Sequence, residues 1–162
     1  MTRLCLDSST KTKPQATDRR RTMPLTLAQA QGILQAATRA ARDANYKPMG
    51  IVVLDAAGHL QAFAREDGAS MFRFDIAQGK AWAAVGMGVS SRQLAARAKD
   101  NPNFFVSLAA SAGGKFLPQT GAVLVRSTDG ELLGAVGASG GTGDEDEAIC
   151  IAGIEAVGLH VG

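Results

Sequence analysis

Three stretches of the chain place apolar residues at helical spacing. The first follows a T-x-x-Q capping box that starts at Thr26, and it predicts a helix over residues 27–44. The second is rich in alanine and predicts a helix over residues 72–87, which Gly88 ends. The third, residues 144–157, is apolar on almost every side. We therefore expect a sheet on one side of this helix and a neighbouring element on the other.

Four shorter runs predict two β-hairpins. Residues 50–54 and 59–65 form the first pair, and residues 121–127 and 131–138 flank Asp129-Gly130, a favoured tight-turn pair. Short hairpins pair antiparallel, and helices precede and follow them. The order therefore predicts one α+β domain, in which helices cover both faces of an antiparallel sheet of about five strands.

The region between the hairpins predicts two shorter helical pieces. A serine-containing start at Ser90 is typical of a helix cap and predicts a helix up to about Ala98. Asn101-Pro102 then begins an irregular or helical piece that continues through Ala110.

The charge of the chain is unevenly distributed. The 162 residues, 46% hydrophobic and 20% charged, fit a single soluble globular domain. Residues 1–22 hold six basic and two acidic residues, whereas the rest holds 11 basic and 13 acidic. We therefore expect a disordered basic tail over residues 1–22 and one folded domain over residues 23–162. The folded part gives no electrostatic reason to expect a nucleic-acid partner.

Cysteine, histidine and hydropathy patterns exclude several classes of protein. The sequence has no apolar window of about 18 residues, so it predicts no membrane span. Cys5 and Cys150 share no metal-site or C-x-x-C spacing, which favours reduced thiols and a cytoplasmic location. We interpret Cys150 as a core residue. His59 falls at a turn and His160 near a fraying end, so we expect no metal site.

The most distinctive segment leads from a strand through glycines into an acidic helix start. Gly140 and Gly141 allow another group to approach the main chain closely. The acidic residues of the helix start occupy the place where a helix would otherwise receive an anion. Ser139 has neither G-x-S-x-G spacing nor a nearby histidine, so we expect no hydrolase triad.

Lys80 is the candidate catalytic residue, because no acidic residue lies at helical spacing from it. Its side chain either extends from a packed face or points into a pocket, where Asp67, Asp146 or Glu147 can meet it. In one interpretation the lysine forms a structural ion pair that holds its helix to the glycine loop. In the other, burial lowers its pKa, and it acts as a base or an electrophile.

Several pieces of the chain, taken in order, resemble one family. They are Val53–Leu60, Asp67–Ala69, Lys80–Ala84, Gly134–Thr142 and Asp146–Ala148. Together they resemble the GlcG/HbpS-like family of haem (heme)-associated proteins, which also includes the C-terminal domain of PduO-type cobalamin adenosyltransferases. The resemblance implies a profilin-like three-layer α/β/α sandwich around a five-stranded antiparallel sheet. It also implies a ligand pocket, haem binding in some members and assembly into homo-oligomers.

Haem-binding members of this family use a histidine on an early helix, as the resemblance implies, whereas the helix predicted over residues 27–44 contains none. We therefore expect weak haem binding, or binding without histidine. Met71 and Met87 can serve as iron ligands, but we interpret both as core residues. The residues that we expect to bind a ligand are Asp67, Arg73, Lys80, Gly140, Gly141 and Asp146.

The sequence leaves three functions open. The first is a small oligomeric protein that binds haem or another small carboxylated or cyclic molecule. The second is an accessory enzyme of small-carboxylate catabolism, a lyase or an isomerase, that uses Lys80. The third is a structural accessory subunit. We expect a homo-oligomer with the pocket near a subunit boundary, because the last helix, the second helix and Phe104-Phe105 offer more apolar surface than one sheet covers.

Overall fold

The computed structural model describes residues 24–162, so the predicted basic tail and Cys5 lie outside the described residues. The helices are α1 (Leu27–Asp43), α2 (Phe72–Met87), α3 (Ser91–Asp100), α4 (Pro102–Ser111) and α5 (Gly143–Ala156). The strands are β1 (Gly50–Asp55), β2 (Leu60–Arg65), β3 (Ala122–Arg126), β4 (Leu132–Ser139) and β5 (His160–Val161).

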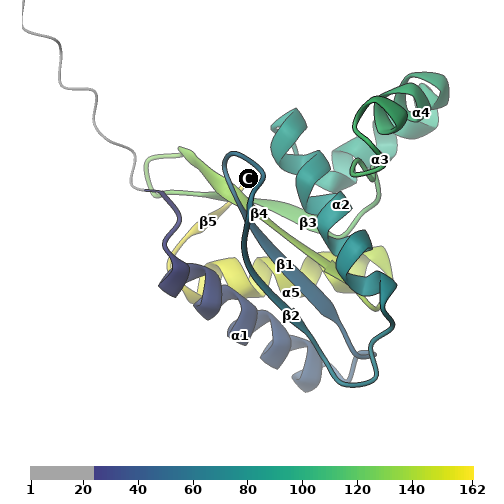
Figure 1. Cartoon of the computed structure of the whole chain (residues 1–162). Helices are drawn as coiled ribbons and strands as arrows, with labels where there is room; N and C mark the ends of the chain where they lie inside the picture. Colours follow the sequence, from purple (N-terminus) through teal and green to yellow (C-terminus); the bar gives the residue numbers. More distant parts are fainter. Residues whose placement is uncertain (1–23) are drawn as a thin grey trace, which may run out of the picture.

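The five strands form one antiparallel sheet in the order β2-β1-β4-β3-β5. The central strands β1 and β4 pair without interruption, from Gly50 opposite Ser139 to Asp55 opposite Gly134. Helices α1 and α5 cover one face of the sheet, and α2 covers the other, with α3 and α4 beyond it (Figure 1). This arrangement confirms the predicted α+β class and the α/β/α sandwich.

Alternate residues of the central strands point to opposite faces and form two cores. The core beneath α1 and α5 contains Ile51, Val53, Val123 and Val136. The core beneath α2 contains Val52, Leu54, Leu124 and Ala135, together with alanines of α2. The small side chains of α2 let this helix approach the sheet closely, which explains why its sequence is rich in alanine.

Helix α5 is apolar on almost every side because it lies between the sheet and α1. Ile149, Cys150 and Ile154 are buried there. A Cβ atom at Gly153 would lie 2.8 Å from the backbone oxygen of Ile33 on α1, so the two helices are in close contact. The predicted cover on both sides of α5 is confirmed, and most of its apolar surface is used within the chain.

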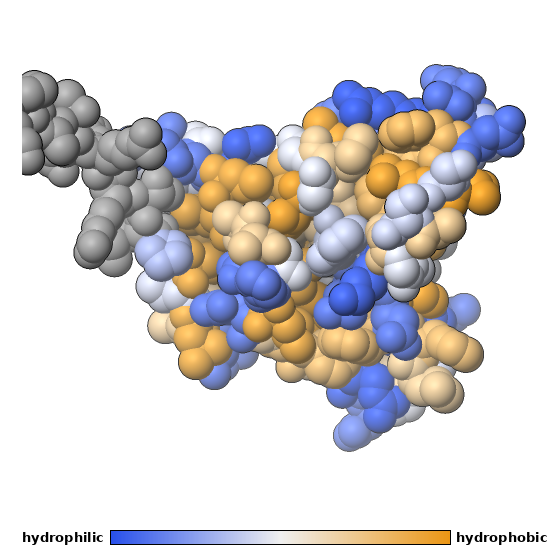
Figure 2. Space-filling view, turned by 45° about the horizontal axis from the view of Figure 1, so that its top comes forward, coloured by the Kyte–Doolittle hydropathy of each residue, from blue (hydrophilic) through white to orange (hydrophobic). Residues whose placement is uncertain are grey.

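The apolar surface that remains exposed lies elsewhere. Helix α4 packs against α3 and stands away from the sheet (Figure 1). Phe105 is buried with Leu94 of α3, Ala83 of α2 and Phe116. In contrast, Phe104 is 49% exposed and Val106 is 70% exposed. Figure 2 shows orange, hydrophobic side chains on the surface of this α3–α4 lobe.

Three details differ from the sequence predictions. Ser90 makes no capping hydrogen bond to α3. Instead the buried Ser91 hydroxyl accepts the N–H of Ala122 and donates to its carbonyl oxygen, so it fastens α3 to β3. Met71 is 73% exposed rather than part of the core, because it precedes the first turn of α2 beyond the sheet. His160 lies in β5, where pairing with β3 holds the end of the chain.

Substitution of Gly137 should test the close packing of α2 on β4. A Cβ atom at this position would lie 2.3 Å from the backbone oxygen of Ala77, so Gly137→Ala should lower the free energy of unfolding by roughly 1–3 kcal/mol or more. Gly86→Ala in α2 is the control, because a Cβ at this position would meet nothing within 4 Å. It should raise stability by about 0.5–1 kcal/mol. Urea denaturation measures the free energy of unfolding of both variants. Equal stability of the two would contradict the close packing of α2 on β4 at Gly137.

Candidate functional site

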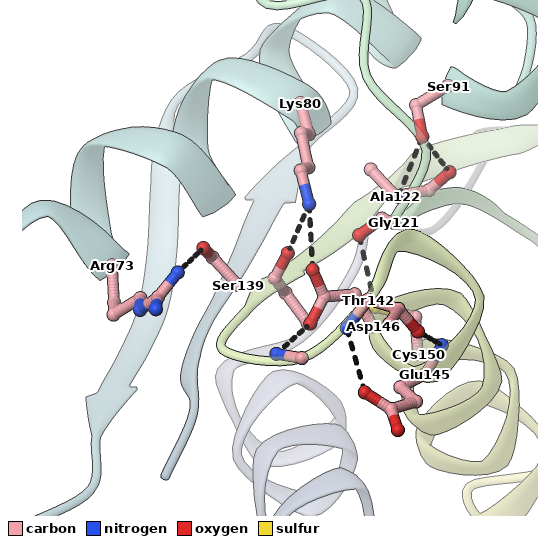
Figure 3. A network of polar contacts seen from close by, with 12 residues as sticks. Arg73, Lys80, Ser91, Gly121, Ala122, Ser139, Thr142, Glu145, Asp146 and Cys150 are labelled. Carbon is pink, nitrogen blue, oxygen red and sulfur yellow. Dashed lines mark hydrogen bonds and ion pairs between the residues drawn. The ribbon is translucent and has the colours of Figure 1, made fainter. Parts of the chain in front are cut away.

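A buried ion pair joins α2 to the start of α5. Lys80 of α2 is 5% exposed and Asp146 of α5 is 2% exposed. The Nζ of Lys80 donates to Oδ2 of Asp146 at 2.8 Å and to the carbonyl oxygen of Ala138 at 3.1 Å (Figure 3). Oδ1 of Asp146 accepts the N–H of Gly141 at 3.0 Å. Additional hydrogen bonds of this kind make a buried charge pair tolerable, and here they also tie the glycine loop to α2.

Of the three acids that the sequence offered as partners for Lys80, the structure places only Asp146 against it. Glu147 faces α3, where it binds Arg92. Asp67 is exposed in the turn after β2 and lines a different surface hollow, with Arg42 and Arg65. The structure therefore does not bring Asp67 to the site, because β2 is an edge strand on the far side of β1.

Gly121 is a site residue that the sequence reasoning missed. Its φ of +122° is one that other residues rarely adopt, and a Cβ there would lie 2.7 Å from both Asp146 Cβ and Lys80 Nζ. Only glycine leaves room for the ion pair beside the start of β3. The available signal was a glycine directly before an apolar strand.

Arg73 lies two turns before Lys80 on α2, and its side chain reaches the same end of β4. Its Nη1 donates to Oγ of Ser139 at 3.2 Å, and Ser139 is buried. Arg73 and Lys80 thus contact consecutive residues of β4, Ser139 and Ala138, and Figure 3 shows both side chains pointing toward this strand end. Within residues 24–162, Arg73 makes no ion pair with an acidic side chain.

These side chains line an open cleft of about 440 Å³, a size that suits a small molecule. Of the predicted ligand-binding residues, Arg73, Lys80, Gly141 and Asp146 line the cleft. Gly140 is buried instead, against Met49 and Pro48. It lies so close to them that a Cβ at this position would collide with both. The remaining lining residues are Ile76, Gln119, Thr120, Ser139, Gly143 and Asp144.

The acidic side chains at the start of α5 already have partners within the chain. Thr142 and Glu145 form a capping box, which their T-x-x-E spacing could have predicted. Arg92 of α3 binds Glu147 and Asp144, and these hydrogen bonds raise the pKa of Arg92 above its usual range. Arg73 is therefore the cation of the cleft whose charge no acidic side chain of the described residues balances.

Cys150 and the histidines take no part in the cleft. Burial raises the pKa of the Cys150 thiol, which makes it unreactive, and its Sγ lies 3.7 Å from the carbonyl oxygen of Gly121. His59 is exposed, with Nδ1 3.5 Å from Oδ2 of Asp55. Among residues 24–162 no three His, Cys, Asp or Glu side chains are grouped to hold a metal ion. In the same range no helix has the length and apolar character needed to cross a membrane.

Comparison with known proteins identifies the fold and a family. Residues 25–155 match the model of a family described as haem degrading protein HbpS-like. The PduOC:heme complex is 26% identical, with a TM-score of 0.75, covering 86% of this chain and 98% of that one. A double mutant of Streptomyces reticuli HbpS is 25% identical, with a TM-score of 0.72, covering 92% and 97%.

Klebsiella pneumoniae ORFY is similar in fold, at 22% identity and a TM-score of 0.77, covering 88% of this chain and 97% of that one. None of the curated proteins matches the chain.

Removal of the Lys80 charge should test the ion pair. Lys80→Met leaves the Asp146 carboxylate buried without a cation, so the free energy of unfolding should fall by roughly 3–5 kcal/mol. Lys80→Met/Asp146→Asn should be more stable than Lys80→Met, because the amide is uncharged and still accepts the Gly141 N–H. Arg42→Met breaks the more exposed Arg42–Glu66 pair and two exposed hydrogen bonds to the carbonyl oxygens of Tyr46 and Lys47, and it should cost less than Lys80→Met. Urea unfolding compares all three, and a loss for Lys80→Met no larger than for Arg42→Met would contradict the assignment.

Proposed function

Because the chain belongs to the HbpS-like family, we propose that it is a small-molecule-binding protein that holds a carboxylate of its ligand at Arg73. One observation carries this proposal: the half-buried Arg73 guanidinium lines the cleft beside the Ser139 hydroxyl and has no acidic partner among the described residues. A guanidinium can donate two parallel hydrogen bonds to a carboxylate. The haem complex among the similar structures supports ligand binding in this fold.

Haem, the ligand that the family suggests, fits this cleft only in part. Arg73 suits one of its carboxylates. However, no His, Cys, Met or Tyr is among the described residues that line the cleft, and Ile76 is the one large apolar side chain there. These residues do not fit the iron or the broad apolar ring. We therefore propose that any haem bound to this chain is held without a histidine ligand, in agreement with the sequence analysis.

The two alternative functions are less well supported. Lys80 donates to both a carboxylate and a carbonyl oxygen, so both of its contacts use it as a hydrogen-bond donor and neither uses it as a base. This favours binding over an enzyme that uses Lys80 as a general base. A structural subunit would be favoured by a site filled with side chains, whereas this cleft is open.

We also propose that the chain forms a homo-oligomer in the cytoplasm. The exposed apolar side chains of Phe104 and Val106 on α4, and of Met71 and Phe72 at the start of α2, support an interface between copies of the chain. The start of α2 also carries Arg73, which is consistent with the predicted position of the pocket near a subunit boundary.

Hemin titration tests the ligand-binding proposal. The Soret band of hemin should show only a weak, saturable shift, because the cleft suits a carboxylate of haem but not its iron or ring. Arg73→Gln should weaken binding about tenfold, because one charge-assisted hydrogen bond contributes about 1.5 kcal/mol. The control Arg39→Gln removes an exposed arginine of α1 and should leave affinity unchanged. His59→Ala/His160→Ala should also bind like the wild type.

Equal affinity of Arg73→Gln and wild type would refute a carboxylate at Arg73. A loss of binding in the double histidine variant would refute binding without histidine. A wild-type chain that shows no saturable change would exclude haem as a ligand.

Light scattering tests the assembly. At micromolar concentration the full chain should have a mass at least twice its 16.7 kDa. Phe104→Ser/Val106→Ser should lower that mass if α4 forms the interface, because both side chains are exposed and polar replacements leave the core intact. Deletion of residues 1–22 should not change it. A monomeric wild-type chain would refute the proposal.

A further inference from the structure

Lys80 has a hydrogen-bond donor that its own chain does not use. An ammonium group carries three N–H donors, and those of Lys80 meet two acceptors, the carbonyl oxygen of Ala138 and Oδ2 of Asp146. No third acceptor lies within reach among the described residues. Lys80 is almost completely buried and borders the cleft. A buried donor without an acceptor is costly, so the third N–H favours an oxygen in the cleft.

Two further donors lie at the same end of β4. The Ser139 oxygen accepts from Arg73, and its hydroxyl proton has no acceptor among the described residues. The guanidinium of Arg73 has N–H groups beyond the one that binds Ser139. Because Arg73 and Lys80 contact consecutive residues of one strand, their donors lie at the same end of β4, on either side of Ser139 (Figure 3).

The charges around this region fit one carboxylate rather than two. The charge of Lys80 is balanced by Asp146, and Asp144 shares Arg92 with Glu147. Of the two basic residues among the described cleft lining, Arg73 is the one without an acidic partner. A second carboxylate placed at Lys80 would lie close to the Asp146 carboxylate and be repelled by it. An uncharged hydroxyl or carbonyl oxygen can accept from Lys80 without that repulsion.

We propose that the ligand is a small hydrophilic monocarboxylate with an uncharged oxygen on the carbon next to the carboxylate, that is, a 2-hydroxy or 2-oxo acid. Arg73 and Ser139 bind its carboxylate, and Lys80 donates to the second oxygen. Gln119 and Thr120 give the rest of the cleft a polar lining. This assignment rests on the proposed function, because it places the carboxylate at Arg73.

Four probes of similar size test the proposal on the full wild-type chain: propionate, lactate, pyruvate and malonate. Isothermal titration should show lactate or pyruvate binding about tenfold more tightly than propionate, because each adds an acceptor for a charged donor. Malonate should bind no more tightly than propionate. Equal binding of propionate, lactate and pyruvate would overturn the proposal, and so would tightest binding of malonate.

Variants separate this proposal from the function on which it rests. Arg73→Gln should weaken all the monocarboxylates about tenfold. If it does not, or if no probe binds, the carboxylate site itself is wrong. Lys80→Gln should bring the affinities of lactate and propionate to within about twofold of each other, with its fold checked by circular dichroism. The control Lys115→Gln, an exposed lysine outside the cleft, should keep the wild-type preference.

A preference for lactate that persists in folded Lys80→Gln would overturn the role of Lys80. If that variant does not fold, Lys80→Gln/Asp146→Asn replaces the charged pair with two amides. The ratio of lactate affinity to propionate affinity in this double variant then tests whether Lys80 binds the second oxygen.

Discussion

The buried pair of Lys80 and Asp146 is the interaction on which the site depends. Removal of two charges from water costs several kcal/mol per ion, and only complete hydrogen bonding offsets that cost. The lysine therefore donates to the end of β4, and the aspartate accepts from the glycine loop. The same pair requires a glycine at position 121, because any Cβ there would overlap both partners. One contact thus fixes α2, β4, the start of β3 and the start of α5 relative to one another.

The ion pairs also determine which charge the cleft presents to a ligand. A helix N-terminus commonly attracts anions, but the start of α5 is occupied by its own capping box and by acids that Arg92 binds. The positive charge that remains belongs to Arg73, on a different helix. In the proposed function, recognition of an anion therefore depends on a side chain of α2 and not on the dipole of α5.

Family membership and site chemistry carry different information in this protein. The sandwich and its match to the HbpS-like family identify the fold, and one similar structure is a complex with heme. The described residues of the cleft, however, offer hydrogen-bond donors and no iron ligand. A shared fold can carry different ligands, because the ligand is chosen by a few side chains and not by the sheet. The polar lining of this cleft favours a small hydrophilic acid.

The sequence by itself determined the class of the fold and most of its elements, although not the short strand β5. Local signals sufficed for this: a capping box at Thr26, a left-handed glycine at Gly88 and apolar periodicity gave α1 and α2 nearly to the residue. The sequence also singled out Lys80, Arg73 and Asp146, but it offered three acids as partners for the lysine. Only the tertiary structure decided among them, because Lys80 and Asp146 are 66 positions apart and meet through the strand order and the packing of α2 on β4. The need for Gly121 and the exposure of Met71 follow from the same long-range packing, which no local pattern encodes.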